Sequence, residues 1–528
     1  MRARNLFLLT AIALGAGCKG NFSQKTVGNV FRYPIPNKPT TMDPGKVQDG
    51  DTIDVIQQVF EGLVGWDDQN HVSPRLATNW DISKDGRTYT FHLRTDAKFS
   101  NGHPVTASDF KWCIERNCNP KLHSETVADY LTAIVGATDA INGKQTDIPG
   151  LKVVDPHTLQ IIIDKPRPYF IGDLTYPDAF VFDRTALPDP TKEMTQASEM
   201  IGTGGFKFEK VDVDTMVTMV ANDLYYEGRP KLDRIERPYV GDATTRLTMF
   251  KTGDVDLVPL ELEDAIELKK DPTYSKQLQV FPRAAIWYIG FNLGGIVPQF
   301  KDVRVRQAFS LAIDKDNIIS NELGGIDERA DGILPPPVFG HRDNMPKMKY
   351  DPAEAQKLLA ECGYPGGKGF PELTMYYRDN RPDIKIVAGA VGQDLKKNLG
   401  VTVNFKPTEW GAYLDLHDAK KIPFLHMRWS ADYLDAQNFL STLLATTGNE
   451  NKIYYHNPQF DALCAAADSS QDPNERLKLY AQAEDIVLKE LPFIPIYFEK
   501  DAELISPRVH GLRTSVFGHL PHTKVSVN

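Results

Sequence analysis

Short alternating segments and amphipathic segments follow one another along the whole chain. Residues 89–94 alternate strictly between apolar and polar side chains, which predicts a half-exposed strand, and the apolar runs at 159–163 and 401–405 also predict strands. One helix is indicated by apolar side chains with the spacing of a single buried stripe, at Val305, Ala308, Phe309, Ala312 and Ile313. Strands and helices mixed throughout in this way indicate an α/β fold.

The start and the end of a second helix are marked by residue type. Asp351 is a favoured capping residue, Pro352 suits the first helical position, and Glu354 is an acid in the first turn. Gly363 is placed to end the helix, because glycine readily adopts the left-handed conformation that follows a last turn.

Composition adds the size and the general class. The chain has 528 residues, 41% hydrophobic and 25% charged, which is a normal globular balance and excludes disordered and coiled-coil classes. Its length suggests about three domains, or two large lobes. The formal net charge is −10 with no basic block, so no nucleic-acid partner is expected. No repeat or long linker marks a domain boundary.

The N-terminus has the pattern of an export signal. Arg2 and Arg4 precede an apolar run at 6–17, which is too short to span a bilayer but typical of a secretory signal peptide over residues 1–17. Small residues then precede Cys18, an arrangement that resembles a bacterial lipobox. The resemblance implies lipidation of Cys18 and a location in the periplasm or at the cell surface, anchored to a membrane. An ordinary signal peptide followed by a chance cysteine is the alternative.

The four other cysteines do not suggest a disulfide framework. Cys113 and Cys118 lie five residues apart, about 140° around a helix, so they cannot bridge within one helix. Small buried hydrophobic side chains are the expected role. Because the protein is expected to be exported, a disulfide bond between Cys362 and Cys464 is still possible.

Motifs of known enzymes and cofactor sites are missing. There is no HExxH, no GxSxG and no GxxxxGK[ST]; the glycines at 363–369 suit a turn, and Lys207 stands where a dinucleotide motif starting at 202–205 needs its third glycine. The 12 histidines include no i,i+4 pair, and His417 and His426 are interpreted as structural. We therefore predict no catalytic residue, no metal and no cofactor.

Eight segments, in one order along the chain, carry a resemblance to a known family. They are TMDP at 41–44, FEGL at 60–63, PRLATNW at 74–80, FSNGHPVTASDF at 99–110, GTG at 202–204, GDVD at 253–256, DVRVRQA at 302–308 and ADYLD at 431–435. Over roughly residues 30–505 the chain resembles the extracytoplasmic solute-binding proteins of oligopeptide and dipeptide ABC importers, solute-binding protein family 5.

The resemblance implies a periplasmic-binding-protein type II fold, with two lobes joined by a hinge and an extra third domain. It places the first lobe at 27–60, 185–285 and 499–528, the extra domain at 61–184, and the second lobe at 286–498. The glycines at 202–205 then become a connection at a structural turn.

The implied function is transport without catalysis. The protein would be a monomer that captures oligopeptides in a cleft between the lobes and delivers them to the permease subunits of an ABC importer. The alternative keeps the fold and changes the solute to a nickel chelate, haem, an oligosaccharide or an opine, because fold alone does not choose the ligand.

A receptor for varied peptides must bind the ammonium group and the backbone that all peptides share. A buried ammonium needs a carboxylate partner, because an unpaired buried charge costs several kcal/mol. The resemblance implies that Asp432 is this partner. The other implied ligand-binding residues are Trp429, Ser430, Ala431 and Tyr433 around it, Trp410 as an aromatic wall, and Gln48, Asp49 and Gly50 on the opposite lobe.

Simpler structural roles remain for several of these residues. Asp432 could cap a helix that begins near Leu434 or Asp435, and Trp410, Trp429 and Tyr433 could pack in a core.

One position departs from the family pattern. Where some oligopeptide receptors place an arginine six residues before the aspartate, this chain has His426, with Arg428 two positions later. The preferred peptide length therefore stays open. Arg304 and Arg306, in another matching segment, are expected to form structural ion pairs.

Overall fold

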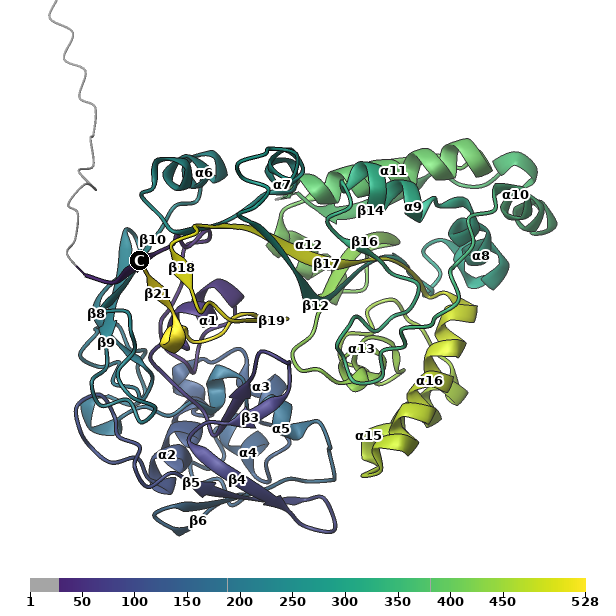
Figure 1. The fold of residues 1–528 in the computed structure, drawn as a ribbon. Helices are drawn as coiled ribbons and strands as arrows, with labels where there is room; N and C mark the ends of the chain where they lie inside the picture. The colour runs from purple at the N-terminus through teal and green to yellow at the C-terminus, as the bar shows by residue number, and fades with distance from the viewer. Residues whose placement is uncertain (1–27, 188, 380) are drawn as a thin grey trace, which may run out of the picture.

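The protein is described by a computed structural model of residues 28–528, except 188 and 380. The predicted signal peptide and Cys18 lie outside these residues. Three sheets of four or more strands organise the described chain, and helices cover them (Figure 1). No described helix is both long enough and apolar enough to cross a membrane.

The first sheet has four strands in the order β1-β10-β9-β8. They are β1 (Val30–Arg32), β10 (Arg234–Pro238), β9 (Met216–Ala221) and β8 (Phe206–Asp212). The chain reaches this sheet from both ends, because the C-terminal strand β21 (Ser526–Val527) contacts β1.

A second four-stranded sheet has the order β4-β5-β7-β6. Its strands are β4 (Ala77–Ile82), β5 (Thr88–Leu93), β7 (Thr158–Ile162) and β6 (Leu151–Asp155). The predicted strands at 89–94 and 159–163 are confirmed as β5 and β7, each beginning one residue earlier. Tyr89, Phe91 and Leu93 are buried and alternate with half-buried side chains, as the pattern predicts. Helix α2 (Ala107–Asn117) contacts β6.

The largest sheet has seven strands and contains the longest two. Its order is β11 (Leu257–Pro259), β17 (Phe493–Ile505), β12 (Leu278–Phe291), β16 (Phe424–Ser430), β14 (Leu373–Arg378) and β15 (Val403–Thr408), with β13 (Glu328–Arg329) paired to β17. In Figure 1, β12 and β17 run from the side that carries α6 (Ala243–Thr252) and α7 (Leu262–Leu268) into the part with β16. The strand predicted at 401–405 begins two residues later, as β15.

The predicted helices form where their residue types require. Helix α8 (Val303–Ala312) buries the expected apolar stripe. Helix α10 (Pro352–Glu361) begins after Asp351, whose side chain accepts from the Glu354 backbone N–H at 3.0 Å, and Gly363 follows its end with φ of 95°. The longest helices are α11 (Pro382–Leu399) and α16 (Pro473–Glu490), and α15 (Pro458–Ser469) packs against α16.

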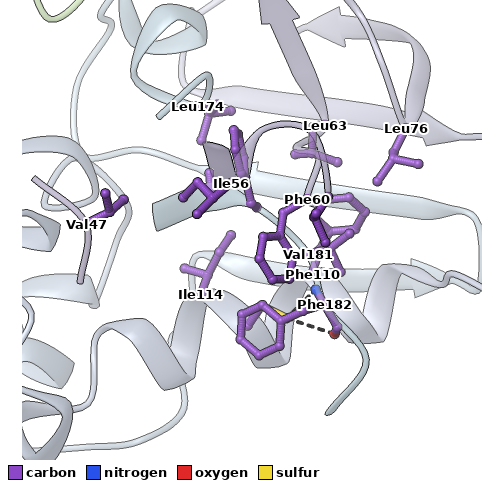
Figure 2. Close-up of a cluster of buried hydrophobic side chains, with 14 of the residues drawn as sticks. Val47, Ile56, Phe60, Leu63, Leu76, Phe110, Ile114, Leu174, Val181 and Phe182 are labelled. Carbon is purple, nitrogen blue, oxygen red and sulfur yellow. Dashed lines mark hydrogen bonds between the residues drawn. The ribbon is translucent and has the colours of Figure 1, made fainter. Parts of the chain in front are cut away.

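One hydrophobic core joins α2 to the segment that follows α1 (Gly50–Ile56) (Figure 2). The Phe60 and Phe182 rings meet edge-on with centroids 6.4 Å apart, and Cys113 Sγ lies 3.4 Å from the Phe182 backbone. All four described cysteines are free. The Cys362–Cys464 bond that the sequence left open is therefore absent: Cys464 is buried in another core, while Cys362 Sγ contacts Asp302 Oδ2 at 3.6 Å.

The glycines at 202–205 mark a close approach of two backbones. The Gly204 N–H donates to the Val59 carbonyl at 2.8 Å, and a Cβ at Gly202 would lie 2.0 Å from that oxygen. Among the matching arginines, Arg304 forms the expected ion pair with Asp302, but the prediction for Arg306 is wrong. The Arg306 guanidinium instead donates to the backbone carbonyls of 300, 490 and 491.

The buried pair Arg116–Asp43 gives a stability prediction. Two parallel bonds join the side chains, one of 2.8 Å from Nη1 to Oδ1, and both groups are at most 1% exposed. Arg116→Ala leaves the Asp43 carboxylate buried without its cation, so we expect a loss of about 3–5 kcal/mol in the free energy of unfolding by urea. The matched control is Arg304→Ala at the exposed pair with Asp302, which should cost about 0–1 kcal/mol. Equal losses of unfolding free energy in the two variants would show that burial of the Arg116–Asp43 pair does not determine its contribution to stability.

Candidate functional site

A cavity of about 340 Å³ is lined by segments from across the sequence. Helix α1, strands β2 (Val64–Trp66) and β12, the segment after β16, and residues 515–521 all contribute. One part of its wall is apolar and includes Phe60, Trp66, Phe180, Phe517 and Leu520. This size and this mixture of apolar walls with a few polar groups are typical of a small-ligand site.

Asp432 lies on the cavity wall between β16 and α13 (Ala436–Phe439). Its Oδ1 accepts from the Tyr130 hydroxyl at 3.0 Å, and its Oδ2 accepts from Asn438 Nδ2 at 2.8 Å. The Asp432 backbone N–H in turn donates to Asn438 Oδ1 at 3.1 Å. Asn438 and Tyr130 therefore hold the carboxylate in one orientation.

Both groups that hold the Asp432 carboxylate are neutral. No lysine, arginine or histidine in the described part of the chain forms a salt bridge with it. Burial raises the pKa of Asp432 above its ordinary value, against the hydrogen bonds from Asn438 and Tyr130. A carboxylate desolvated in this way favours a cationic ligand group.

Strand β16 carries an edge beside Asp432. It pairs with β12 along its length, ending at Ser430 opposite Ala285, and the Ala431 N–H donates to the Ala284 carbonyl at 2.7 Å. On its other side, registered pairing with β14 is limited to Phe424 and Leu425. Among the described strands, the rest of this edge has no registered partner, so it can pair with an extended ligand backbone.

Positive groups line another part of the same cavity. Arg283 and Arg428 both line it, and Arg428 forms an ion pair with Glu499. Burial alone would raise the pKa of Glu499, but the adjacent guanidinium of Arg428 holds it at about 2. His519 lies 2.9 Å from a carboxylate oxygen of Glu503, and although burial opposes its charge, this carboxylate raises the pKa of His519 to about 8. These positive groups therefore lie on another part of the wall than Asp432, together with the carboxyl groups of Asp54 and Glu61.

Five of the nine predicted ligand-binding residues line the cavity: Gln48, Gly50, Ser430, Ala431 and Asp432. Asp49 does not, because its side chain caps α1 by accepting from the Thr52 N–H at 2.8 Å. The capping alternative for Asp432 is wrong: the capping residue of α13 is Asp435, whose side chain accepts from the Gln437 N–H.

The three predicted aromatic residues lie outside the cavity lining and pack instead. Trp410 stacks on Tyr413 with ring centroids 5.8 Å apart, and Trp429 Nε1 donates to Asn438 Oδ1 at 3.1 Å. The Tyr433 ring stacks on Tyr169 at 5.3 Å and is 9% exposed. Trp429 supports Asp432 indirectly, because both bind Asn438.

The position that departs from the family pattern also has a defined place. His426 is 1% exposed and packs against Trp287, whereas Arg428 reaches the cavity. The sequence interpretation missed Tyr130, which lies 302 residues before Asp432 and had no local signal. It also missed Asn438, although its position six residues after Asp432, within the short helix α13, could have indicated a local partner.

Comparison with known proteins identifies relatives over nearly the whole chain. A family model described as bacterial extracellular solute-binding proteins, family 5 Middle, matches residues 71–451. Periplasmic oligopeptide-binding protein OppA of Salmonella typhimurium is 32% identical over 486 residues, covering 89% of this chain and 87% of its own. The probable deoxycholate-binding periplasmic protein YgiS of Escherichia coli is 31% identical, covering 91% and 90%.

A solved structure agrees in fold. The unliganded open form of MppA, a periplasmic murein tripeptide binding protein, superposes with a TM-score of 0.81 at 28% identity, covering 95% of this chain and 98% of its own. The predicted α/β fold of periplasmic binding proteins is confirmed. Since the family model and these relatives cover most of the chain, the protein belongs to the bacterial extracellular solute-binding proteins of family 5.

Proposed function

We propose that the protein captures oligopeptides with a free amino terminus in this cavity and delivers them to an ABC importer. Members of the family are extracytoplasmic transport binding proteins. The observation that carries the proposal is the Asp432 carboxylate, which lines the cavity and which, among the described residues, is held by the neutral groups of Tyr130 and Asn438 alone. A peptide ammonium would supply the missing positive charge.

The surroundings of Asp432 suit an extended peptide that enters amino end first. Its backbone would pair with the open edge of β16 near Ser430, which recognises main chain rather than sequence. Its side chains would meet apolar walls such as Trp66 and Phe517, whose rings lie 4.8 Å apart. The positive groups Arg283 and His519 would favour an acidic or carboxyl-terminal group farther along.

We propose that closure joins two lobes and an extra domain, with the boundaries that the sequence suggests. Asp432 belongs to the proposed second lobe (286–498) and Tyr130 to the proposed extra domain (61–184), so their 3.0 Å bond would cross the cleft. The register of β12 against β17 is irregular between Pro282 and Ile286, next to the proposed lobe boundary. A ligand that contacts both sides would favour the closed arrangement.

A second candidate function keeps the cavity and changes the solute. The apolar part of the wall, including Phe60, Trp66 and Phe517, could pack on a rigid apolar molecule. The relative YgiS is described as a probable deoxycholate-binding protein. Haem, a nickel chelate, an oligosaccharide or an opine are further solutes for this alternative.

Replacing Asp432 tests the ammonium site. Asp432→Asn keeps the size of the side chain and removes its charge, so binding of a free-amine tripeptide, measured by calorimetry, should weaken by more than about tenfold. An N-acetylated tripeptide should bind the wild type weakly and be little affected by the substitution. Because burial raises the pKa of Asp432, its charge costs stability at neutral pH, so the unliganded melting temperature should stay equal or rise.

The control for this experiment lies three residues away. Asp435 caps α13 and forms a buried ion pair with Arg476 at 2.7 Å. Asp435→Asn should lower the unliganded melting temperature by breaking that pair. If Asp432→Asn destabilised the unliganded protein as strongly and left tripeptide affinity unchanged, Asp432 would be structural and the peptide proposal would fail.

The solute that the protein carries can be identified directly. We expect native mass spectrometry of protein purified without denaturation to release a mixture of short peptides. Peptide bonding to the β16 edge is independent of sequence, so the mixture should be heterogeneous. Consistent recovery of a bile acid, haem, sugar or metal chelate without peptides would replace the leading proposal with the second candidate.

We also propose export and lipid anchoring at Cys18, which the sequence of residues 1–18 supports. Cys18→Ser removes the thiol that would carry the lipid, so the protein should move from the membrane fraction to the soluble fraction and lose labelling by radioactive palmitate. A wild-type protein that takes up no label, and fractionates like the variant, would show that Cys18 follows an ordinary signal peptide.

A further inference from the structure

Three potential metal ligands meet on the cavity wall away from Asp432. Asp54 comes from α1, while His519 and His522 come from the C-terminal segment. One ligand atom from each residue lies within 4.8 Å of the other two. Asp54 and His519 line the cavity, and His522 is fully buried behind them. The sequence suggested no metal site because these histidines are three residues apart and the acid lies at the other end of the chain.

The Asp54 carboxylate has one occupied and one free oxygen. Its Oδ2 accepts from Arg237 Nη1 at 2.7 Å and from the Tyr33 hydroxyl at 3.1 Å. Its Oδ1 is buried and accepts no hydrogen bond from any described residue. The nearest ring nitrogen of His519, Nδ1, lies 3.8 Å from this Oδ1, which is beyond hydrogen-bond distance.

The two histidines repeat this arrangement. His519 Nε2 lies 2.9 Å from Glu503 Oε2, which leaves Nδ1 directed at Asp54. His522 Nε2 lies 2.6 Å from the Tyr33 oxygen, and since the single Tyr33 proton is donated to Asp54, this Nε2 must carry the proton between them. His522 Nδ1 then keeps a lone pair, buried and without a partner among the described residues.

In each of the three side chains, one polar atom is thus hydrogen-bonded to a second residue, and the other is available to bind a metal ion. Metal-binding histidines have this environment, because a carboxylate or another polar group binds the second ring nitrogen and fixes the ring. Glu503 does so for His519, and Tyr33 does so for His522. A neutral imidazole with one ring nitrogen unpartnered is also the form that binds metal.

We propose that Asp54 Oδ1, His519 Nδ1 and His522 Nδ1 form a site for a divalent transition-metal ion on the wall of the ligand cavity. Two imidazoles and one carboxylate favour zinc or nickel over magnesium and calcium, which prefer oxygen ligands. Three protein ligands leave a coordination position open, and Asp54 and His519 direct it to the cavity.

The local charge permits such an ion. Arg237 places a positive charge near Asp54, but it binds the oxygen that the proposed site does not use. An ion bound at His519 Nδ1 would displace the proton that makes the unliganded ring positive, and the carboxylates of Asp54 and Glu503 would then together exceed the charge of Arg237. A divalent ion would still leave the site net positive, so an anionic ligand group is the expected occupant of the open position. The metal site itself does not depend on whether the transported solute is a peptide.

The chain contains a matched control. His417, Asp418 and Glu450 form a second group with ligand atoms within 4.8 Å, but Asp418 is exposed and the group lies outside the cavity lining. An ion held loosely at the surface would bind there equally well. Removing one histidine from each group therefore separates the proposed site from surface binding.

The test titrates the full-length chain, stripped of metal by a chelator, with zinc or nickel chloride in a calorimeter. We expect one saturable equivalent, no saturable binding of magnesium, and a melting temperature that rises with zinc. His519→Gln and His522→Gln should each weaken zinc binding by more than about tenfold, as expected for loss of a ligand. His417→Gln should bind zinc like the wild type.

X-ray absorption of the wild-type protein with one zinc equivalent gives a reading that does not depend on a variant folding. Two imidazole nitrogens in the first shell, unchanged in His417→Gln, would support the site. No saturable binding, an all-oxygen shell, or loss of binding in His417→Gln but not in His519→Gln would each overturn the proposal.

Discussion

The pairing of β12 with β17 is the constraint on which the rest of the arrangement depends. Pairing runs from Leu278–Leu504 at one end to Gly290–Phe493 at the other, so the two strands hold opposite sides of the molecule in fixed register. The only register shifts fall between Pro282 and Ile286 and at Trp287. In the closure proposed above, one side would turn against the other about this pair, because hydrogen-bonded strands resist sliding.

The same strands bring charge to the cavity. Arg283 comes from β12 at the irregular point, Glu499 and Glu503 come from β17, and Arg428 is opposite Trp287 on β16. Buried charges of this kind are stable only with close partners, and here the partners come from neighbouring strands. Pairing of the strands therefore fixes where the positive part of the cavity can be.

Asp432 and Asp435 have chemically identical side chains, but their surroundings give them different roles. Asp435 has the roles of a structural aspartate, because it caps a helix and is bound by the Arg476 guanidinium. The Asp432 carboxylate, three residues earlier, accepts hydrogen bonds from just two described side chains, the Tyr130 phenol and the Asn438 amide. The sequence alone could not distinguish a cap from a ligand group, since the distinction depends on Tyr130, which is remote in the chain.

In contrast, the helix after Asp351 and the strand at Thr88–Leu93 were predictable, because capping residues and alternation act within a few positions. Trp410 and Tyr433 show the limit of transferring pocket residues by motif, since each ring finds a stacking partner elsewhere.

The polarity of the cavity connects the two proposals. An extended peptide is itself a dipole, with an ammonium at one end and a carboxylate at the other. With the ammonium at Asp432, the far end would meet Arg283 and the proposed metal site, of which His519 is one ligand. A divalent ion there would add attraction for a carboxylate within the low-dielectric cavity, where screening by water is weak. A peptide too short to reach the ion would lose this attraction and bind more weakly, because water would stay in the open coordination position. Length selection in this receptor would then depend on the separation of two charged ends, while the apolar walls between them would leave side-chain identity free.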